Sequence, residues 1–168
     1  MKPLIDKGFD LNRIIDLIVN SSTAMIFGSG HTVLLPLLDD KLNKDNFPNI
    51  KEIKILLMDP NGSAVNLAEY RARKSLRNLY IENSLIVQNL VSKNPNKILF
   101  SVIDFLPPYN IIVINPDMPS GEMFVRLSAW QTSVTDRPVI HFNINENQEL
   151  FDFFIRQFNI MWDEVNNQ

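Results

Sequence analysis

Side chains that could carry acid–base or phosphoryl chemistry are sparse in this chain of 168 residues. It contains only two histidines, His31 and His141, and no cysteine. A histidine can attack phosphorus as a nucleophile or protonate a leaving oxygen. Neither histidine has a partner His, Asp or Glu at metal-ligand spacing, and thiolate ligands are lacking. We therefore expect no metal ion and no cofactor.

The first histidine stands beside a candidate anion site. His31 follows the run Gly28-Ser29-Gly30 and is predicted to begin a helix. Free N–H groups and the helix dipole favour an anion at a helix N-terminus, so Ser29, Gly30 and His31 are candidate ligands of a phosphate or carboxylate. The alternative is a tight glycine turn followed by an exposed histidine. His141 lies in a predicted strand, where it either makes a structural hydrogen bond or points into a pocket.

Polar residues follow the predicted strands. Asp59 and Asp104 both come just past a strand end. Because ligands of open α/β sheets bind outside the carboxyl ends of the strands, Asp59 and Asn61 could line one crevice with Ser29 and Gly30. Equally, Asp59 could form the turn that follows it.

Two further groups have a binding and a structural interpretation. Arg71, Arg73 and Arg77 could hold an anion, or they could form a solvated helix face. Tyr109 and Trp130 could stack on a base or another ring, or they could belong to the core.

Hydrophobic periodicity and turn residues predict the elements that position these side chains. Helices are expected over about residues 10–20, 31–42, 63–92 and 146–165. Strands are expected over about residues 23–27, 53–58, 97–104, 111–114, 123–130 and 138–143, with polar connections at 45–49 and 131–137. The early alternation of strand and helix favours a parallel part, and the later strands favour antiparallel additions. The predicted fold class is α/β: a mixed sheet of about six strands sandwiched between helices, in one domain (1–168) with a helical lead-in (about 1–20).

Composition limits the function classes. With 45% hydrophobic residues and a net charge of −3, the chain is typical of a globular protein, and nonspecific nucleic-acid binding through phosphate neutralisation is disfavoured. No apolar run approaches the roughly 20 residues that span a bilayer. The N-terminus lacks the apolar region of a signal peptide, so we expect a cytoplasmic protein without membrane contact.

The order of several short motifs resembles a phospholipase D-like fold. The likeness covers about residues 20–165 and is nearest to the catalytically silent branch found beside helix-turn-helix domains in bacterial regulators. The motifs are a strand end, the lead-in to a later strand, a late strand and an aromatic closing helix. In this sequence they read Leu56-Leu57-Met58-Asp59-Pro60, Pro107-Pro108-Tyr109, Pro138-Val139-Ile140-His141, and Phe154, Phe158 and Trp162.

The catalytic motif of that superfamily is His-x-Lys, then four residues and Asp, with a Gly-Ser-x-x-Asn-like stretch on the next strand. Counted back from Asp117, the lysine position is Ile112 and the histidine position is Asn110. The stretch with Ser128 and Trp130 resembles the second part. Asn110 cannot take a phosphoryl group and Ile112 cannot hold phosphate charge, so the resemblance implies a scaffold without catalytic residues.

The resemblance implies a non-catalytic regulatory or sensor domain. We expect it to bind a small anionic ligand such as a nucleotide, to form a homodimer, and to signal to a fused DNA-binding or effector domain, without contacting nucleic acid itself. The alternatives are a dimerisation module without ligand and a phosphodiesterase or nuclease with a rearranged site. The residues expected at the ligand site are Ser29, Gly30, His31, Asp59, Asn61, Arg71, Arg73, Tyr109, Asn110, Asp117, Ser128, Trp130 and His141.

Overall fold

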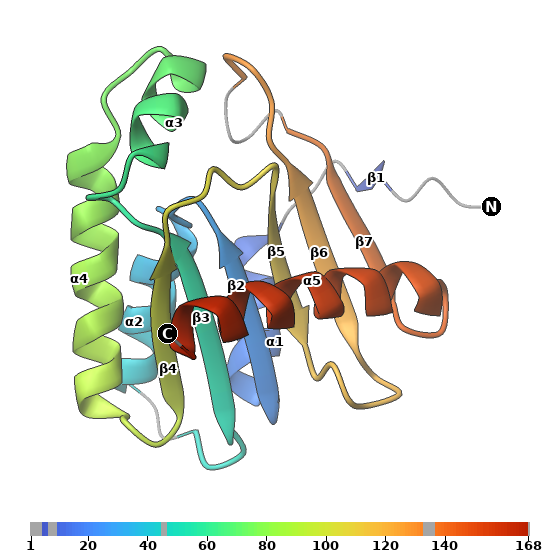
Figure 1. Cartoon of the computed structure of the whole chain (residues 1–168). Helices are drawn as coiled ribbons and strands as arrows, with labels where there is room; N and C mark the ends of the chain where they lie inside the picture. Colours follow the sequence, from blue (N-terminus) through green and yellow to red (C-terminus); the bar gives the residue numbers. More distant parts are fainter. Residues whose placement is uncertain (1–4, 7–9, 45–46, 133–136, 168) are drawn as a thin grey trace.

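The computed structural model of the chain describes residues 5–6, 10–44, 47–132 and 137–167 (Figure 1). The expected helical lead-in and the two polar connections lie partly outside the described residues.

The described strands form one seven-stranded mixed sheet. Its order is β1 (Ile5–Asp6), β7 (Val139–Asn143), β6 (Glu122–Leu127), β5 (Tyr109–Ile114), β2 (Thr23–Gly28), β3 (Glu52–Met58) and β4 (Ile98–Ile103). Strands β2, β3 and β4 are parallel, and β5, β6, β7 and β1 join by antiparallel pairing. The predicted fold class is confirmed. The short β1 adds a strand where only a helical lead-in was expected.

Helices cover both faces of the sheet (Figure 1). The helices α1 (Leu11–Asn20), α2 (Leu34–Lys44) and α4 (Arg77–Lys93) lie on one face, and α5 (Gln148–Asn166) lies on the other. The short α3 (Ala64–Ala72) lies beyond the end of the sheet. No helix of the described part of the chain is long and apolar enough to cross a membrane.

The central strands are apolar on both sides because both sides are covered. In β5, Ile112 and Ile114 pack in the core under α1, α2 and α4, whereas Ile111 and Val113 pack under α5. All four are at most 2% exposed, and each burial contributes roughly 1.5–3 kcal/mol. The aromatic face predicted for the last helix is also confirmed, since α5 buries Phe151, Phe154 and Phe158 in the same core as β5.

The helix predicted over residues 63–92 is wrong in one respect, because the chain breaks it into α3 and α4. Arg73 adopts a left-handed conformation (φ 56°) and ends α3. The Glu69 carboxylate then accepts from the backbone N–H groups of Leu76 and Arg77, which lowers the Glu69 pKa. The apolar stripe continues across the break, so hydrophobic periodicity predicted one helix instead of two.

One predicted strand end also differs. The strand expected over residues 123–130 ends at Leu127, so Ser128 and Trp130 lie in the connection that follows. Pro138 accepts from the Leu127 N–H, and Pro108 accepts from the Ser128 N–H. The chain therefore leaves the sheet at the end where β2 and β3 finish.

Candidate functional site

The carboxyl end of β2 is where most of the expected site residues meet. Strand β5 runs antiparallel to β2, so its first residues lie beside the last residues of β2. The Asn110 side chain uses its Oδ1 to accept the Ser29 backbone N–H at 3.0 Å. Asn110 therefore holds the loop after β2 in place.

Two glycines make this close packing possible. A Cβ on Gly28 would overlap the Asn110 amide and lie 2.8 Å from His31 Nε2. A Cβ on Gly30 would lie 2.6 Å from the Tyr80 ring. Neither glycine has a positive φ, so the requirement is for space rather than for unusual backbone.

His31 is not placed as an N-terminal anion ligand. Helix α2 begins at Leu34, three residues later, and His31 itself is left-handed (φ 46°). Its Nε2 lies 2.9 Å from the Phe27 carbonyl oxygen, so Nε2 carries the proton and donates it. The His31 pKa is lowered to about 4: burial is the largest cause, the hydrogen bond to Phe27 opposes it, and the charge of Arg126 adds to the lowering. His31 is therefore neutral at pH 7.

Three arginines converge above this loop. Arg126 on β6 pairs in register with Asn110 on one side and with Val139 on the other. Arg137 precedes Val139 by two residues, and its guanidinium donates to the Thr132 carbonyl oxygen at 3.1 and 3.2 Å. Arg71 at the end of α3 reaches the same region, because the charge of Arg137 acts on it. We call Arg71, Arg126 and Arg137 the arginine cluster.

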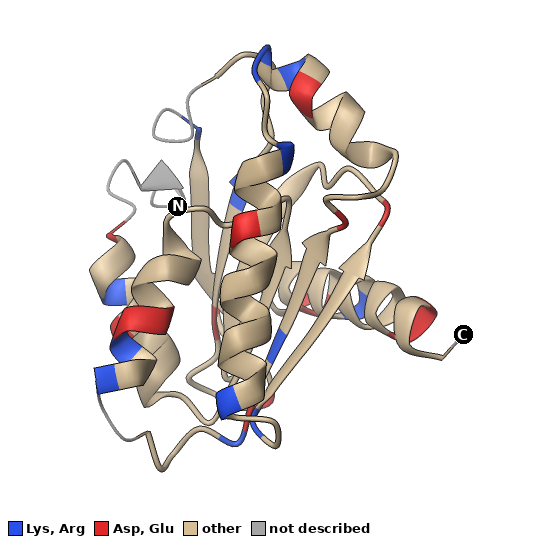
Figure 2. Cartoon of the chain, turned by 90° about the vertical axis from the view of Figure 1, so that its left-hand side faces the viewer, with Lys and Arg blue, Asp and Glu red and all other residues tan. Residues whose placement is uncertain are grey.

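Arg71 and Ser128 meet at one acceptor. The Arg71 Nη1 and the Ser128 hydroxyl both donate to the Pro107 carbonyl oxygen, at 3.4 and 3.1 Å. The Arg71 carbonyl in turn accepts the Gln131 N–H at 3.2 Å. These bonds tie α3 to the connection after β6. Figure 2 shows Lys and Arg gathered around α3 at this end of the molecule.

The positive charges of the arginine cluster act against one another. Burial lowers the pKa of Arg71 and of Arg126, and the positive charge of Arg137 lowers both further. Among the described residues, no carboxylate forms an ion pair with Arg71 or Arg137. The buried Tyr80 also lies here; burial raises its pKa, while a hydrogen bond with Ser29 and the charges of Arg71 and Arg137 oppose that rise.

An exposed aromatic group lies at the rim. The Arg73 guanidinium carbon lies 4.7 Å from the centre of the Tyr70 ring and 5.5 Å from the Trp130 ring. The two rings meet edge to face with centroids 5.3 Å apart, and they are 59% and 51% exposed. We call Tyr70, Arg73 and Trp130 the aromatic stack.

The acidic residues at the strand ends have structural roles. The Asp59 carboxylate accepts the Asn61 N–H at 2.8 Å, so both residues belong to the turn after β3. Asp104 accepts from the Ala64 N–H and the Ser63 hydroxyl at 2.7 and 2.9 Å. These hydrogen bonds lower the Asp104 pKa and cap α3 from another part of the chain.

Three expected site residues lie elsewhere. Asp117 is exposed in the β5–β6 hairpin, at the end of the sheet opposite Asn110. Tyr109 packs edge to face between Phe27 and Phe154 in the core under α5, on the other face from Asn110. His141 stacks on Phe124, and its Nε2 lies 2.9 Å from Glu122 Oε2, as a structural histidine would.

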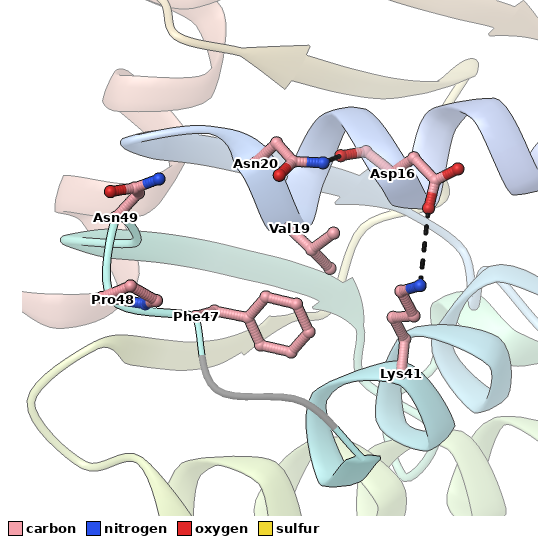
Figure 3. Close-up of a pocket in the computed structure, with 7 residues that line it drawn as sticks. All are labelled: Asp16, Val19, Asn20, Lys41, Phe47, Pro48 and Asn49. Carbon is pink, nitrogen blue, oxygen red and sulfur yellow. Dashed lines mark hydrogen bonds and ion pairs between the residues drawn. The ribbon is translucent and has the colours of Figure 1, made fainter.

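Two hollows lie at the other end of the parallel strands. The larger, about 390 Å³, lies between α1, α2 and the segment before β3 (Figure 3). Its lining consists of Asp16, Val19, Asn20, Lys41, Phe47, Pro48 and Asn49. The smaller, about 80 Å³, adjoins it and contains Lys97 and Asn94. Neither contains a residue expected at the ligand site.

The arrangement suits anion binding better than catalysis. Each histidine uses its Nε2 in a hydrogen bond, one with a carbonyl and one with a carboxylate. No three His, Asp or Glu side chains of the described residues converge to hold a metal ion. What does lie close together is a set of guanidinium and hydroxyl donors near the loop after β2.

Sequence reasoning missed Arg126, Arg137 and Tyr80. Arg126 follows the buried apolar run Met123-Phe124-Val125 in β6. A partly buried charge at the end of such a run needs a reason, and this signal was available in the sequence. Arg137 and Tyr80 had none, because only the strand pairing and the break between α3 and α4 bring them to the site.

Comparison with models of known protein families finds no match, and comparison with curated proteins finds none either.

Proposed function

We propose that this chain is a non-catalytic binding domain that holds a small anion in the arginine cluster. The observation that carries the proposal is the gathering of Arg71, Arg126 and Arg137 at the carboxyl end of β2, where their charges repel one another. Like charges held close together and partly buried make it costly to keep every one of them ionised. An anion would relieve that repulsion and receive charge-assisted hydrogen bonds.

Neutral donors complete the proposed site. The Tyr80 hydroxyl interacts with Ser29, and the charges of Arg71 and Arg137 act on Tyr80. Asn110 fixes the Ser29 backbone. Glycines at positions 28 and 30 let the loop sit close to these side chains. Such a site recognises an anion through several directed donors rather than through net charge alone.

The chemistry of the residues supports binding without turnover. Asn110 is neither a nucleophile nor an acid, and Ile112 is buried in the core. His31 is neutral at pH 7 and donates its Nε2 proton to a backbone carbonyl. A phosphodiesterase with a rearranged site would need a different nucleophile, and this makes it the weaker alternative.

The regulatory part of the proposal rests on α3. Arg71 is in α3, and the left-handed Arg73 separates α3 from α4. An anion bound by Arg71 together with Arg126 and Arg137 would tie α3 more firmly to the sheet. We propose that this change in α3 is the signal passed to a fused or partner domain, in a cytoplasmic regulator.

We also propose that the chain forms a homodimer. The alternative function is a dimerisation module that binds no ligand. The observation that favours dimerisation is that β4 ends the sheet, with β3 as its one partner strand among the described residues. An open strand edge is a template for pairing with another chain. A protein that is only such a module would melt at a temperature that depends on its concentration and not on anions.

The test is a thermal-shift screen at constant ionic strength with inorganic phosphate, pyrophosphate, sugar phosphates and nucleotides. At 100 times its dissociation constant a ligand contributes about 2.7 kcal/mol, or roughly 5–10 °C for a chain of this size. The Arg71→Met variant should lose the shift. Arg156→Met is the matched control, since Arg156 is exposed on α5, and it should keep the shift. A folded wild type that responds to none of these anions contradicts the proposal.

A further inference from the structure

The aromatic stack and the arginine cluster adjoin along one short segment. Trp130 belongs to the stack, the Gln131 N–H binds the Arg71 carbonyl, and the Thr132 carbonyl holds the Arg137 guanidinium. Two residues of chain span at most roughly 7 Å. The backbone of Trp130 therefore lies close to the carbonyl oxygen that binds Arg137 and to the end of α3 that carries Arg71.

The exposure of the stack calls for an explanation. Tyr70 and Trp130 are 59% and 51% exposed, although aromatic rings are usually buried. They meet edge to face and the Arg73 guanidinium lies near both ring centres, yet about half of each side chain stays open to solvent. Ordered, open aromatic rings beside a cationic site are the arrangement that proteins use to stack nucleobases.

Two residues at the aromatic stack have an uncommon backbone conformation. Arg73 in the stack and Gln131 next to Trp130 are two of the four non-glycine residues with positive φ in the described chain. Such conformations are uncommon for side chains of this kind and concentrate at functional sites.

The arginine cluster also selects among anions. One guanidinium fork can occupy both oxygens of a carboxylate, whereas a phosphate monoester offers three terminal oxygens to several donors. Three arginines with neutral hydroxyl partners therefore match a phosphate better than a carboxylate. With His31 neutral, the site is not further charged by that ring at pH 7.

We propose that the ligand is a nucleotide, whose phosphate lies in the arginine cluster and whose base stacks on the Trp130 ring beside Tyr70. This rests on the proposed anion-binding function and specifies its ligand class. Of the two aromatic residues expected to stack, Trp130 keeps that role, and Tyr70 replaces Tyr109, which is in the core.

The test compares adenosine, guanosine, cytidine and uridine monophosphates with ribose 5-phosphate, which shares the phosphate and lacks the base. A Trp162→Phe background leaves Trp130 as the sole tryptophan, because the chain has two. At least one nucleotide should quench Trp130 fluorescence saturably and bind on the order of 10-fold more tightly than ribose 5-phosphate. By calorimetry, Trp130→Leu should lower the affinity for that nucleotide to that for ribose 5-phosphate and leave the sugar phosphate unaffected.

The outcomes separate the two proposals. Equal affinities for ribose 5-phosphate and all four nucleotides, unchanged by Trp130→Leu, would overturn the base-stacking proposal and leave anion binding standing. Binding of neither class to a folded wild type would overturn both. Tyr70→Leu provides a second variant: it should weaken binding of the nucleotide more than binding of ribose 5-phosphate, and equal weakening of both would show that the stack merely attaches α3.

Discussion

Replacing Gly28 by alanine tests the packing on which the whole site depends. The new methyl group would overlap the Asn110 amide and crowd the His31 ring. Both neighbours are held, Asn110 by the Ser29 N–H and His31 by the Phe27 carbonyl. Because neither can move without losing a hydrogen bond, we expect Gly28→Ala to cost about 1–3 kcal/mol, as overpacking in a close-packed region does.

The cause can be isolated with a double-mutant cycle. Asn110→Ala alone should cost about 1 kcal/mol, for the lost hydrogen bond to Ser29. In that background the Gly28 methyl has room, so Gly28→Ala should cost at least about 1 kcal/mol less than in the wild type.

Urea unfolding followed by circular dichroism gives all four free energies of unfolding. An unchanged m-value would show that the changes reflect stability. Costs that simply add, to within about 0.5 kcal/mol, would refute the close approach of Asn110 to Gly28.

Three further predictions concern charges. Arg71→Met should raise the unfolding free energy of the ligand-free protein by about 0.5–1 kcal/mol, because it removes a partly buried charge that Arg137 repels and gives up only one long hydrogen bond. A loss of stability in urea would contradict this. Because the folded pKa of His31 is lowered to about 4 from 6.5, the fold should lose at most ~3 kcal/mol of stability as the pH falls from 6.5 to 4, with no further loss from this group below pH 4. The His31→Gln variant should lack this pH-dependent loss, and an NMR titration midpoint of His31 near 6.5 would disprove the prediction. Asp104 has a lowered pKa, so its capping of α3 is present above the unfolded pKa and lost as the pH falls through the folded one; Asp104→Ala should speed amide hydrogen exchange at the start of α3, and Asp104→Asn should do so less.

The fold was largely predictable because its signals are local or periodic. Runs such as Ile111–Ile114 are apolar on both faces, and this alone indicates a covered sheet. The break at Arg73 was not predictable, because a left-handed arginine has no signature and the bonds that stabilise the turn come from the Glu69 side chain. Nor was β1, whose two residues are too few to show a pattern.

The site was predictable only in part, for a different reason. Ser29, Asn110, Arg71 and Ser128 were expected there and do lie at one end of the sheet. Asp117 was grouped with Asn110 through motif spacing, yet a hairpin carries it to the opposite end.

Arg126 and Arg137 were not predicted at the site because their place depends on which strands pair. Arg126 and Arg137 come together because β6 pairs with both β5 and β7, and no spacing along the chain reveals which strands will be neighbours.

The most direct test of the central claim is an NMR titration of the arginine side-chain Nε–Hε signals of the wild type with inorganic phosphate at fixed ionic strength. The signals of Arg71, Arg126 and Arg137 should shift together along one saturating curve, while the signal of the exposed Arg156 on α5 should not shift. If all seven arginine signals drift alike with phosphate, or if none of the three saturates, the arginine cluster is not an anion site.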